Sequence, residues 1–128
     1  MMSTITRIQL PKKQAVLYSD GVLFENVLLI SGMLPTNSDG QIVGLGDAAA
    51  QAEQVFQNIE AVLLEAGGSF SDIVKLNIYL TNIEDRPIIS PVRQKYFGHD
   101  KPASTLLEIS RLAHPDALLE IEAMAYLG

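Results

Sequence analysis

The chain has 128 residues and a net charge of −6, and 48% of its residues are hydrophobic. This length is typical of a single hydrophobic core, so we expect residues 1–128 to form one domain. The absence of Cys excludes disulfides, thiolate nucleophiles and Cys-ligated metal sites. The nine basic residues are scattered along the acidic chain, which argues against a nucleic-acid partner.

The segment Met1–Leu10 alternates polar and apolar side chains around Arg7, unlike the charged and then apolar order of a secretory signal. No apolar run is long enough to span a bilayer. We therefore predict no membrane association and a cytoplasmic location. The surplus of apolar residues favours an oligomer.

Short β-rich runs separated by tight turns open the chain. We expect strands over Ile5–Gln9, Val16–Tyr18, Val22–Phe24 and Val27–Ser31, arranged as a meander. The cluster Asn37-Ser38-Asp39-Gly40 then marks a longer loop.

A helix is predicted next, with Asp47 as its N-cap and Gly67-Gly68 as a left-handed C-terminal turn. Its apolar positions recur every three or four residues, which predicts one buried face. These positions are Ala52, Val55, Phe56, Ile59, Val62, Leu63 and Ala66.

The segment Ile73–Leu80 alternates as a half-buried strand does, with Val74 on its apolar side. A second helix is expected from Ser90, as N-cap, to about Phe97. We place Pro91 at its first position because a proline further inside a helix removes a backbone donor.

The last two strands are expected over Ala103–Ser110 and Leu118–Tyr126. The element order predicts an α+β fold with both helices on one face of the sheet. The final strand has a purely apolar side, whereas its other side has Glu120 and Glu122 next to large apolar residues.

The alternation alone leaves two interpretations of Glu120 and Glu122 open. They are solvated, or paired with a cation across a subunit boundary. Alternatively, one of them is a general acid or base whose pKa is raised by apolar neighbours and by the other carboxylate.

Other polar residues also allow two interpretations. Ser104 and Thr105 either donate hydrogen bonds to a ligand or satisfy the local backbone. Tyr18 is either a pocket phenol or a strand-forming residue. His99 and His114 have no second ligand at metal-binding spacing, so we predict no metal site.

Several short motifs follow one another in a fixed order along nearly the whole chain, and together they resemble the RidA/YjgF family, also called the endoribonuclease L-PSP or translation-inhibitor family. The motifs are Tyr18-Ser19-Asp20-Gly21-Val22, Leu29-Ile30-Ser31-Gly32-Met33-Leu34-Pro35, Ala50-Gln51-Ala52 with Asn58-Ile59, Asp72-Ile73-Val74-Lys75, Lys101-Pro102-Ala103 and Glu120-Ile121-Glu122-Ala123.

The resemblance implies a chorismate-mutase-like α+β domain assembled as a homotrimer, with a small-molecule ligand in each cleft between subunits. It implies hydrolysis of reactive enamine or imine intermediates to oxo compounds and ammonia, without metal or organic cofactor. By the same resemblance, Tyr18 is the pocket tyrosine, Ser31 and Gly32 line the cleft, and Glu120 orients the attacking water. Glu122 is then expected to serve the subunit interface.

One departure from the family bears on the substrate. The family deaminases have an arginine two residues after the proline of the Pro102-Ala103 motif, and a cysteine two residues further on. Here these positions are Ser104 and Leu106, on either side of Thr105. A hydroxyl loses a charge-assisted interaction of about 1.5–3 kcal/mol with a substrate carboxylate.

The departure leaves three functional interpretations. The first is a deaminase whose substrate lacks the usual α-carboxylate. The second is a non-catalytic trimer that binds a small ligand or a partner in the same cleft. The third, an endoribonuclease or translation inhibitor, is opposed by the acidic charge and by the lack of a His-based cluster.

Overall fold

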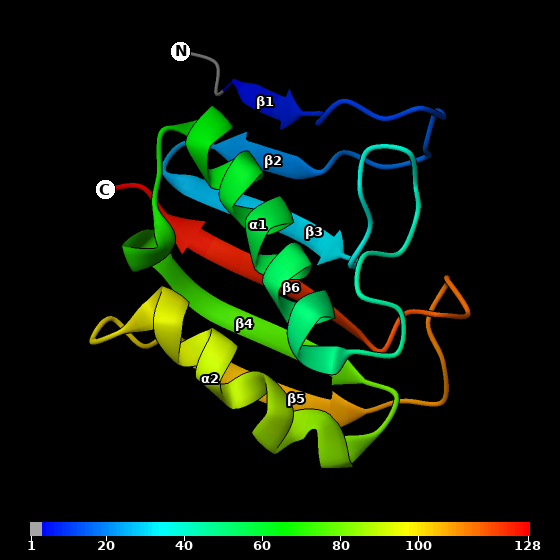
Figure 1. Ribbon diagram of the computed structural model, residues 1–128. Coiled ribbons are helices and arrows are strands. Elements are labelled where there is room, and N and C mark those ends of the chain that lie inside the picture. Colours follow the sequence, from blue (N-terminus) through cyan, green and yellow to red (C-terminus); the bar gives the residue numbers. More distant parts are fainter. Residues whose placement is uncertain (1–3) are drawn as a thin grey trace.

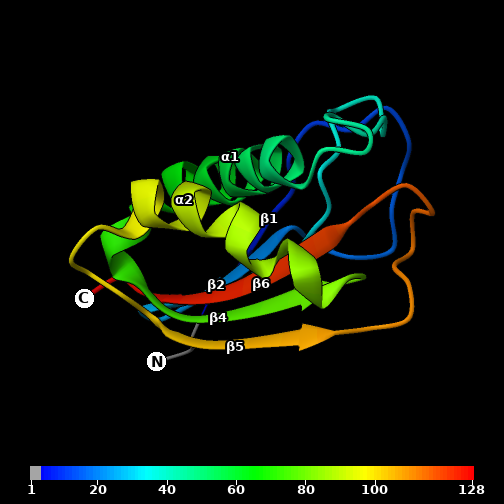
Figure 2. The same ribbon diagram turned by 60° about the horizontal axis from the view of Figure 1, so that its bottom comes forward.

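The computed structural model describes residues 4–128, so the first three residues of the segment Met1–Leu10 lie outside it. One sheet, with strand order β1-β2-β3-β6-β4-β5, is covered by two α-helices on one face and is bare on the other (Figures 1 and 2). β4 and β5 pair in parallel, whereas the other neighbours pair antiparallel. The α+β class and the placement of the helices on one face are confirmed.

The N-terminal meander consists of β1 (Ile5–Ile8), β2 (Gly21–Phe24) and β3 (Val27–Met33). The strand expected over Val16–Tyr18 is wrong, since this segment is an irregular loop. β2 pairs with β1 on one side and with β3 on the other, so the run before it joins neither strand of the meander.

Helix α1 (Ala48–Ala66) has the predicted ends. The Asp47 side chain accepts a hydrogen bond from the Ala50 N–H, and Gly67 ends the helix at φ 82°. The apolar face of α1 packs on the sheet. A Cβ at Gly21 would lie 2.6 Å from Cγ1 of Val62, so β2 needs a glycine where the helix passes over it.

A short 3₁₀ turn, η1 (Phe70–Asp72), leads into β4 (Ile73–Leu80). The prediction that Val74 is on the buried side is wrong: Val74 is 46% exposed and Ile73 is buried instead. The pairing with β6 shifts between Ile73 and Lys75, and this bulge turns Val74 outward.

Helix α2 (Arg86–Phe97) follows a second 3₁₀ turn, η2 (Ile83–Asp85), and ends where predicted. Its predicted start is wrong, because Pro91 lies inside the helix and Pro87 occupies the first turn. Ser90 is not the N-cap, since its hydroxyl donates to the Arg86 carbonyl at 2.9 Å. A proline is tolerated in the first turn, which lets the helix begin there.

The chain ends with β5 (Ala103–Glu108) at the sheet edge and β6 (Leu119–Tyr126) near its centre. The predicted alternation of β6 is confirmed: the side chains on its apolar side are buried. The bare face instead exposes large apolar side chains from β3, β5 and β6. These are Leu29, Leu107, Met124 and Tyr126.

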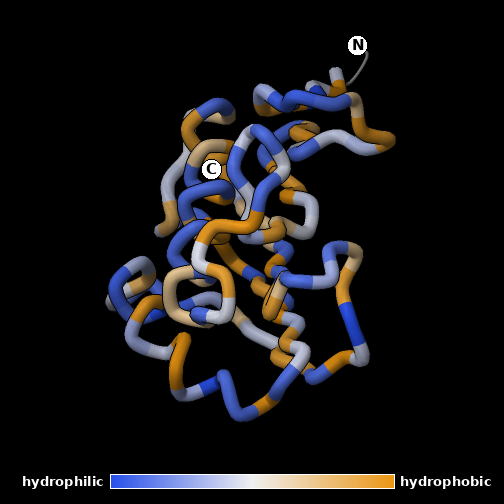
Figure 3. Tube along the Cα trace, turned by 45° about the vertical axis from the view of Figure 1, so that its right-hand side comes forward, coloured by the Kyte–Doolittle hydropathy of each residue, from blue (hydrophilic) through white to orange (hydrophobic). Residues whose placement is uncertain are grey.

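Hydrophobic and hydrophilic residues alternate along the trace (Figure 3). Among residues 4–128, neither helix is long and apolar enough to cross a membrane.

Candidate active site

Two of the residues predicted for the site meet where β3 and β6 lie side by side. A Cβ added to Gly32 of β3 would lie 2.7 Å from the carboxyl carbon of Glu120 on β6. The Glu120 carboxyl therefore lies directly against the Gly32 backbone. A side chain at position 32 would displace it, so the glycine leaves the space that the carboxyl occupies.

The carboxyl of Glu120 is half-buried on the sheet face that lacks helices. Burial raises its pKa, and the negative charge of Glu122 raises it further. The Glu120 carboxyl therefore holds a proton at a higher pH than an exposed glutamate does. A carboxyl with such a pKa is suited to exchange a proton with a bound water.

Glu122 has hydrogen-bond donors within its own chain. Its Oε1 accepts from the Asn77 amide at 2.9 Å and from the Tyr79 hydroxyl at 2.6 Å. Both donors come from β4, which pairs with β6 in register. These bonds keep the charge of Glu122 close to Glu120, while a role for Glu122 at a subunit interface stays a prediction.

Tyr18 belongs to the loop before β2 and lies close enough to Asp20 and Glu120 to respond to their charges. Burial raises the pKa of the Tyr18 phenol, and the two carboxylates raise it further. The phenol therefore stays protonated at neutral pH and is available as a hydrogen-bond donor. Tyr18, Gly32 and Glu120 form one group, which we call the Glu120 cluster.

The loop that holds Tyr18 is fixed by Ser31 and Asp20. The Ser31 hydroxyl donates to the Ser19 carbonyl at 2.6 Å, and the Ser31 N–H donates to the Asp20 carbonyl at 2.9 Å. The buried Asp20 carboxylate accepts from the Leu10 N–H at 2.8 Å and pairs with the Lys12 ammonium. The side chain of Ser31 thus supports the loop rather than pointing freely into a site.

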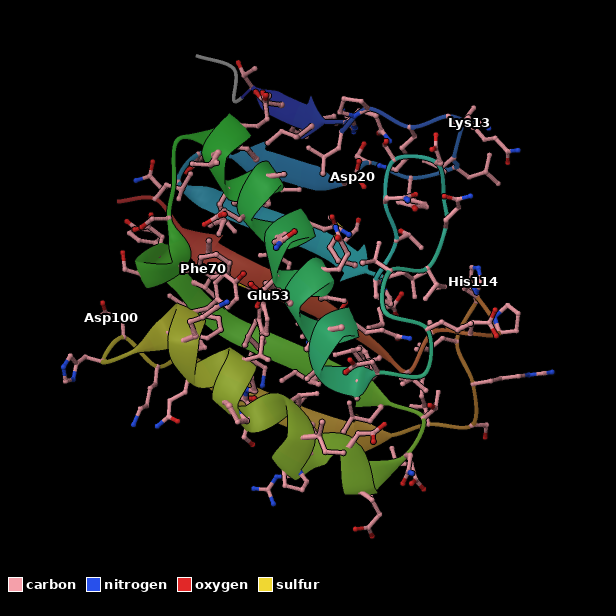
Figure 4. The ribbon with its side chains drawn as sticks, in the orientation of Figure 1. Lys13, Asp20, Glu53, Phe70, Asp100 and His114 are labelled. Atoms are coloured by element: carbon pink, nitrogen blue, oxygen red, sulfur yellow. The ribbon has the colours of Figure 1, made fainter. Side chains whose placement is uncertain are left out.

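A cavity of about 1060 Å3 adjoins the Glu120 cluster, and both Tyr18 and Gly32 line it. Other parts of its wall come from residues 10–16, from residues 33–40 and from residues 113–115. Asp20, Lys13 and His114 also line it, and Lys13 and His114 lie on the right-hand side of the molecule in Figure 4. Asn58 and Ala61 of α1 also line the cavity, whereas Glu120 does not, so the cavity reaches the cluster at Tyr18 and Gly32.

The three remaining predicted residues lie elsewhere. Ser104, Thr105 and Leu106 are on β5, which β4 separates from β6. Ser104 and Leu106 are in register with the buried Leu76 and Ile78, on the face that carries the helices.

Thr105 is on the bare face, where its hydroxyl accepts a hydrogen bond from the Lys75 ammonium at 2.9 Å. The Ser104 hydroxyl accepts one from Nη2 of Arg93 at 3.1 Å. One chain therefore does not bring these residues to Glu120.

The sequence interpretation missed Asp20 as a buried anchor and Arg93 as the neighbour of Ser104. Asp20 lies inside a quoted motif, yet only the folded chain brings Lys12 to it. Nothing in the sequence distinguishes Arg93 from other helix residues. Its contact with Ser104 forms only when the chain folds and β5 comes to lie near α2. Among residues 4–128, no three His, Cys, Asp or Glu side chains gather closely enough to hold a metal ion.

The chain is similar to known proteins over most of its length. Residues 9–127 match the family described as Endoribonuclease L-PSP. A RutC family protein of Pyrococcus horikoshii is 42% identical over 110 residues, which are 85% of this chain and 86% of the relative. The 3-aminoacrylate deaminase RutC of Acinetobacter baylyi is 37% identical over 103 residues, 80% of this chain and 81% of that protein.

A solved structure, RidA from an Antarctic Psychrobacter bacterium, superposes with a TM-score of 0.85 at 34% identity. The alignment covers 94% of this chain and 98% of that one. The sequence matches and the shared fold lead to the same assignment: the chain belongs to the RidA/YjgF family, whose sequence family is described as Endoribonuclease L-PSP.

Proposed function

We propose that this protein is a deaminase that hydrolyses reactive enamine or imine intermediates to oxo compounds and ammonia. The observation that carries the proposal is the half-buried Glu120 carboxyl, which lies against Gly32 near a protonated phenol and has a raised pKa. The deaminase RutC of Acinetobacter, 37% identical, supports the same class of reaction.

The chemistry needs a base and a hydrogen-bond donor beside one small substrate. An enamine first gains a proton at carbon to become the imine. Glu120 removes a proton from water while the oxygen bonds to the imine carbon and the C=N double bond becomes a single bond, and Glu120 then returns this proton to the nitrogen, which gives the carbinolamine. The hydroxyl proton of the carbinolamine passes through Glu120 to the nitrogen as the C–N bond breaks and the C=O bond forms, so ammonia leaves and Glu120 is a carboxylate again. The Tyr18 hydroxyl holds a polar group of the substrate.

We further propose that the complete site lies in a cleft between the subunits of a homotrimer. Within one chain, Ser104 and Leu106 are on the opposite sheet face from Glu120, so a site that includes all three needs a second subunit. The exposed apolar side chains on the bare face, such as Met124 and Tyr126, support an interface there. No metal or organic cofactor has a part in the proposed reaction.

The net charge of −6 disfavours the alternative of RNA cleavage, because RNA binding depends on concentrated positive charge. Retention of RNA that falls steeply with salt would support that alternative instead.

The test couples the protein to a threonine dehydratase, which releases 2-iminobutanoate, and follows 2-oxobutanoate while semicarbazide competes for the imine. A neutral imine is assayed in parallel. We expect at least one of the two imines to be hydrolysed well above the buffer rate. If both decay at the buffer rate, the protein is not a deaminase of this class, and a ligand-binding trimer becomes the better account.

A further inference from the structure

Asp20 is the one buried side chain with a charge within residues 4–128, and the reaction proposed above does not use it. It closes the loop of residues 9–20, whose two ends are adjacent because Ile8 of β1 and Gly21 of β2 are paired in register. Tyr18 lies two positions before Asp20 in this loop. An anchor at Asp20 therefore restricts where the Tyr18 phenol lies.

Asp20 is bonded to three separate parts of the chain. Its carboxylate accepts from the Leu10 N–H at 2.8 Å and pairs with the Lys12 ammonium, both in the first half of the loop. Its N–H donates to the Ile8 carbonyl at the end of β1, at 2.9 Å. Its carbonyl accepts from the Ser31 N–H of β3, also at 2.9 Å. One residue thus holds together the first half of the loop, its end and the strand beneath it.

The ion pair of Asp20 and Lys12 is largely shielded from solvent, since their side chains are 2% and 24% exposed. A buried carboxylate is costly unless a cation and hydrogen-bond donors compensate it, and here both come from the same loop. Opening the loop would leave the carboxylate without these partners. The pair therefore favours the closed loop.

Neighbouring groups do not replace this pair. Lys13 forms no ion pair within residues 4–128, and its N–H donates to the Ser38 carbonyl at 3.0 Å. The Ser31 hydroxyl donates to the Ser19 carbonyl, which fixes the residue after Tyr18 but not the first half of the loop.

The charge of Asp20 also favours the form of Tyr18 that donates a hydrogen bond. Burial raises the pKa of the Tyr18 phenol, and the charges of Asp20 and Glu120 raise it further. Asp20 therefore acts on both the position and the protonation of the phenol.

We propose that Asp20 is a positioning residue: with Lys12 it closes the loop of residues 9–20 and so holds the Tyr18 hydroxyl where it donates a hydrogen bond to the substrate. Asp20 does not act on the reacting atoms itself, because the Leu10 N–H and Lys12 already bind its carboxylate. The inference rests on the proposed deaminase function, and it adds a residue outside the Glu120 cluster on which the reaction depends.

The kinetic test uses Asp20→Asn, which keeps the size of the side chain but removes its charge. We expect kcat/KM for the imine to fall at least about tenfold, as for the loss of one charge-assisted contact. Lys12→Met should cause a similar fall, and Lys12→Arg, which keeps a cation, should lie closer to the wild-type value. The control Asp100→Asn removes the same charge from an exposed loop on the opposite side of the molecule from Lys13 (Figure 4) and should leave kcat/KM unchanged.

A double-mutant cycle separates positioning from general damage to the fold. If Asp20 acts through Tyr18, Asp20→Asn should change kcat/KM by less than about twofold in a Tyr18→Phe background. A full loss in that background as well would contradict the proposed role. Thermal melts show whether each variant is folded. If Asp20→Asn is not, the double variant Asp20→Asn, Lys12→Met replaces it, because it leaves no unpaired charge.

NMR relaxation of the Tyr18 amide measures the hold on the loop without any substrate. Its order parameter should fall from about 0.85, typical of rigid backbone, to below about 0.6 in Asp20→Asn, and should not change in Asp100→Asn. An unchanged order parameter in Asp20→Asn would overturn the proposal.

The two readouts separate this inference from the proposed function. If the imine is hydrolysed and Asp20→Asn has the wild-type kcat/KM, the deaminase stands and the role of Asp20 is wrong. If the wild-type protein hydrolyses no imine, the deaminase fails, and the order parameter alone decides whether Asp20 holds Tyr18 in place.

Discussion

The two carboxylates of β6 are two positions apart in the sequence and have different surroundings. Glu122 accepts hydrogen bonds from Asn77 and Tyr79, which fix the position of its carboxyl group. Glu120 lies against Gly32 and has a pKa raised by burial and by Glu122. The division of labour that we propose, a reacting Glu120 and a charge-setting Glu122, follows from these surroundings.

The substitution Glu122→Gln tests this division. Glutamine keeps an acceptor for Asn77 and Tyr79 but removes the like charge, so the pKa of Glu120 should fall. A general base works in its deprotonated form, so activity rises as pH increases through the pKa of Glu120. We therefore expect the acid limb of the profile of kcat/KM against pH to move to lower pH.

The matched control for this experiment is Glu65→Gln, which removes the charge of an exposed residue on α1. Its acid limb should coincide with that of the wild-type protein. An acid limb that stays in place or moves to higher pH in Glu122→Gln would show that Glu122 does not set the pKa of Glu120.

At this scale the sequence predicted only part of the site. The resemblance brought Tyr18, Gly32 and Glu120 together as site residues, and the structure brings them near one another. Asp20 and Arg93 were missed because their partners, Lys12 and Ser104, are recognised only once the chain is folded.

Among the elements, α2 shows how a local rule can be applied correctly and still give the wrong boundary. The sequence analysis placed Pro91 at the first position of the helix. The structure instead uses Pro87 in the first turn and keeps Pro91 inside the helix. Burial of Ile89 and Phe97 against the core offsets the lost backbone bond.

The substitution Pro91→Ala should therefore stabilise the protein by roughly 1–3 kcal/mol, because it restores an interior helix donor and removes the clash with the preceding turn. Urea unfolding at a fixed protein concentration measures this change. Pro87→Ala is the control: a first-turn N–H has no helical partner, so its effect should be within about 1 kcal/mol. A Pro91→Ala variant no more stable than Pro87→Ala would contradict the account.

β4 illustrates a different limit of sequence reasoning. Strict alternation placed Val74 in the core, but a bulge shifts the register so that Ile73 is buried instead. The bulge arises from the pairing with β6, which is far away in the sequence. Periodicity within one strand does not contain that information.

At the scale of the whole molecule, the α+β class and the face covered by helices were predictable from the element order. The insertion of β6 between β3 and β4 was not, since it joins the two halves of the chain through long-range pairing. This insertion places Glu120 beside Gly32, so the site exists only in the complete sheet.

The bare sheet face leads to a prediction about assembly. We expect sedimentation equilibrium at micromolar concentration to give a mass of three chains of 13.9 kDa each. Met124→Lys should dissociate the trimer, because it places a charge among the exposed apolar side chains of that face. Leu64→Lys, on the outer side of α1, should leave the mass unchanged. A monomeric wild-type protein would contradict the proposed intersubunit cleft.

The most direct test of the central claim is the hydrolysis rate of the imine by Glu120→Gln. Glutamine keeps nearly the same shape but cannot accept the proton of the attacking water. If Glu120 is the base, kcat/KM should fall by about 10²- to 10⁴-fold relative to the wild-type protein, while Glu65→Gln keeps the wild-type value. A Glu120→Gln variant that hydrolyses the imine at the wild-type rate would contradict the account.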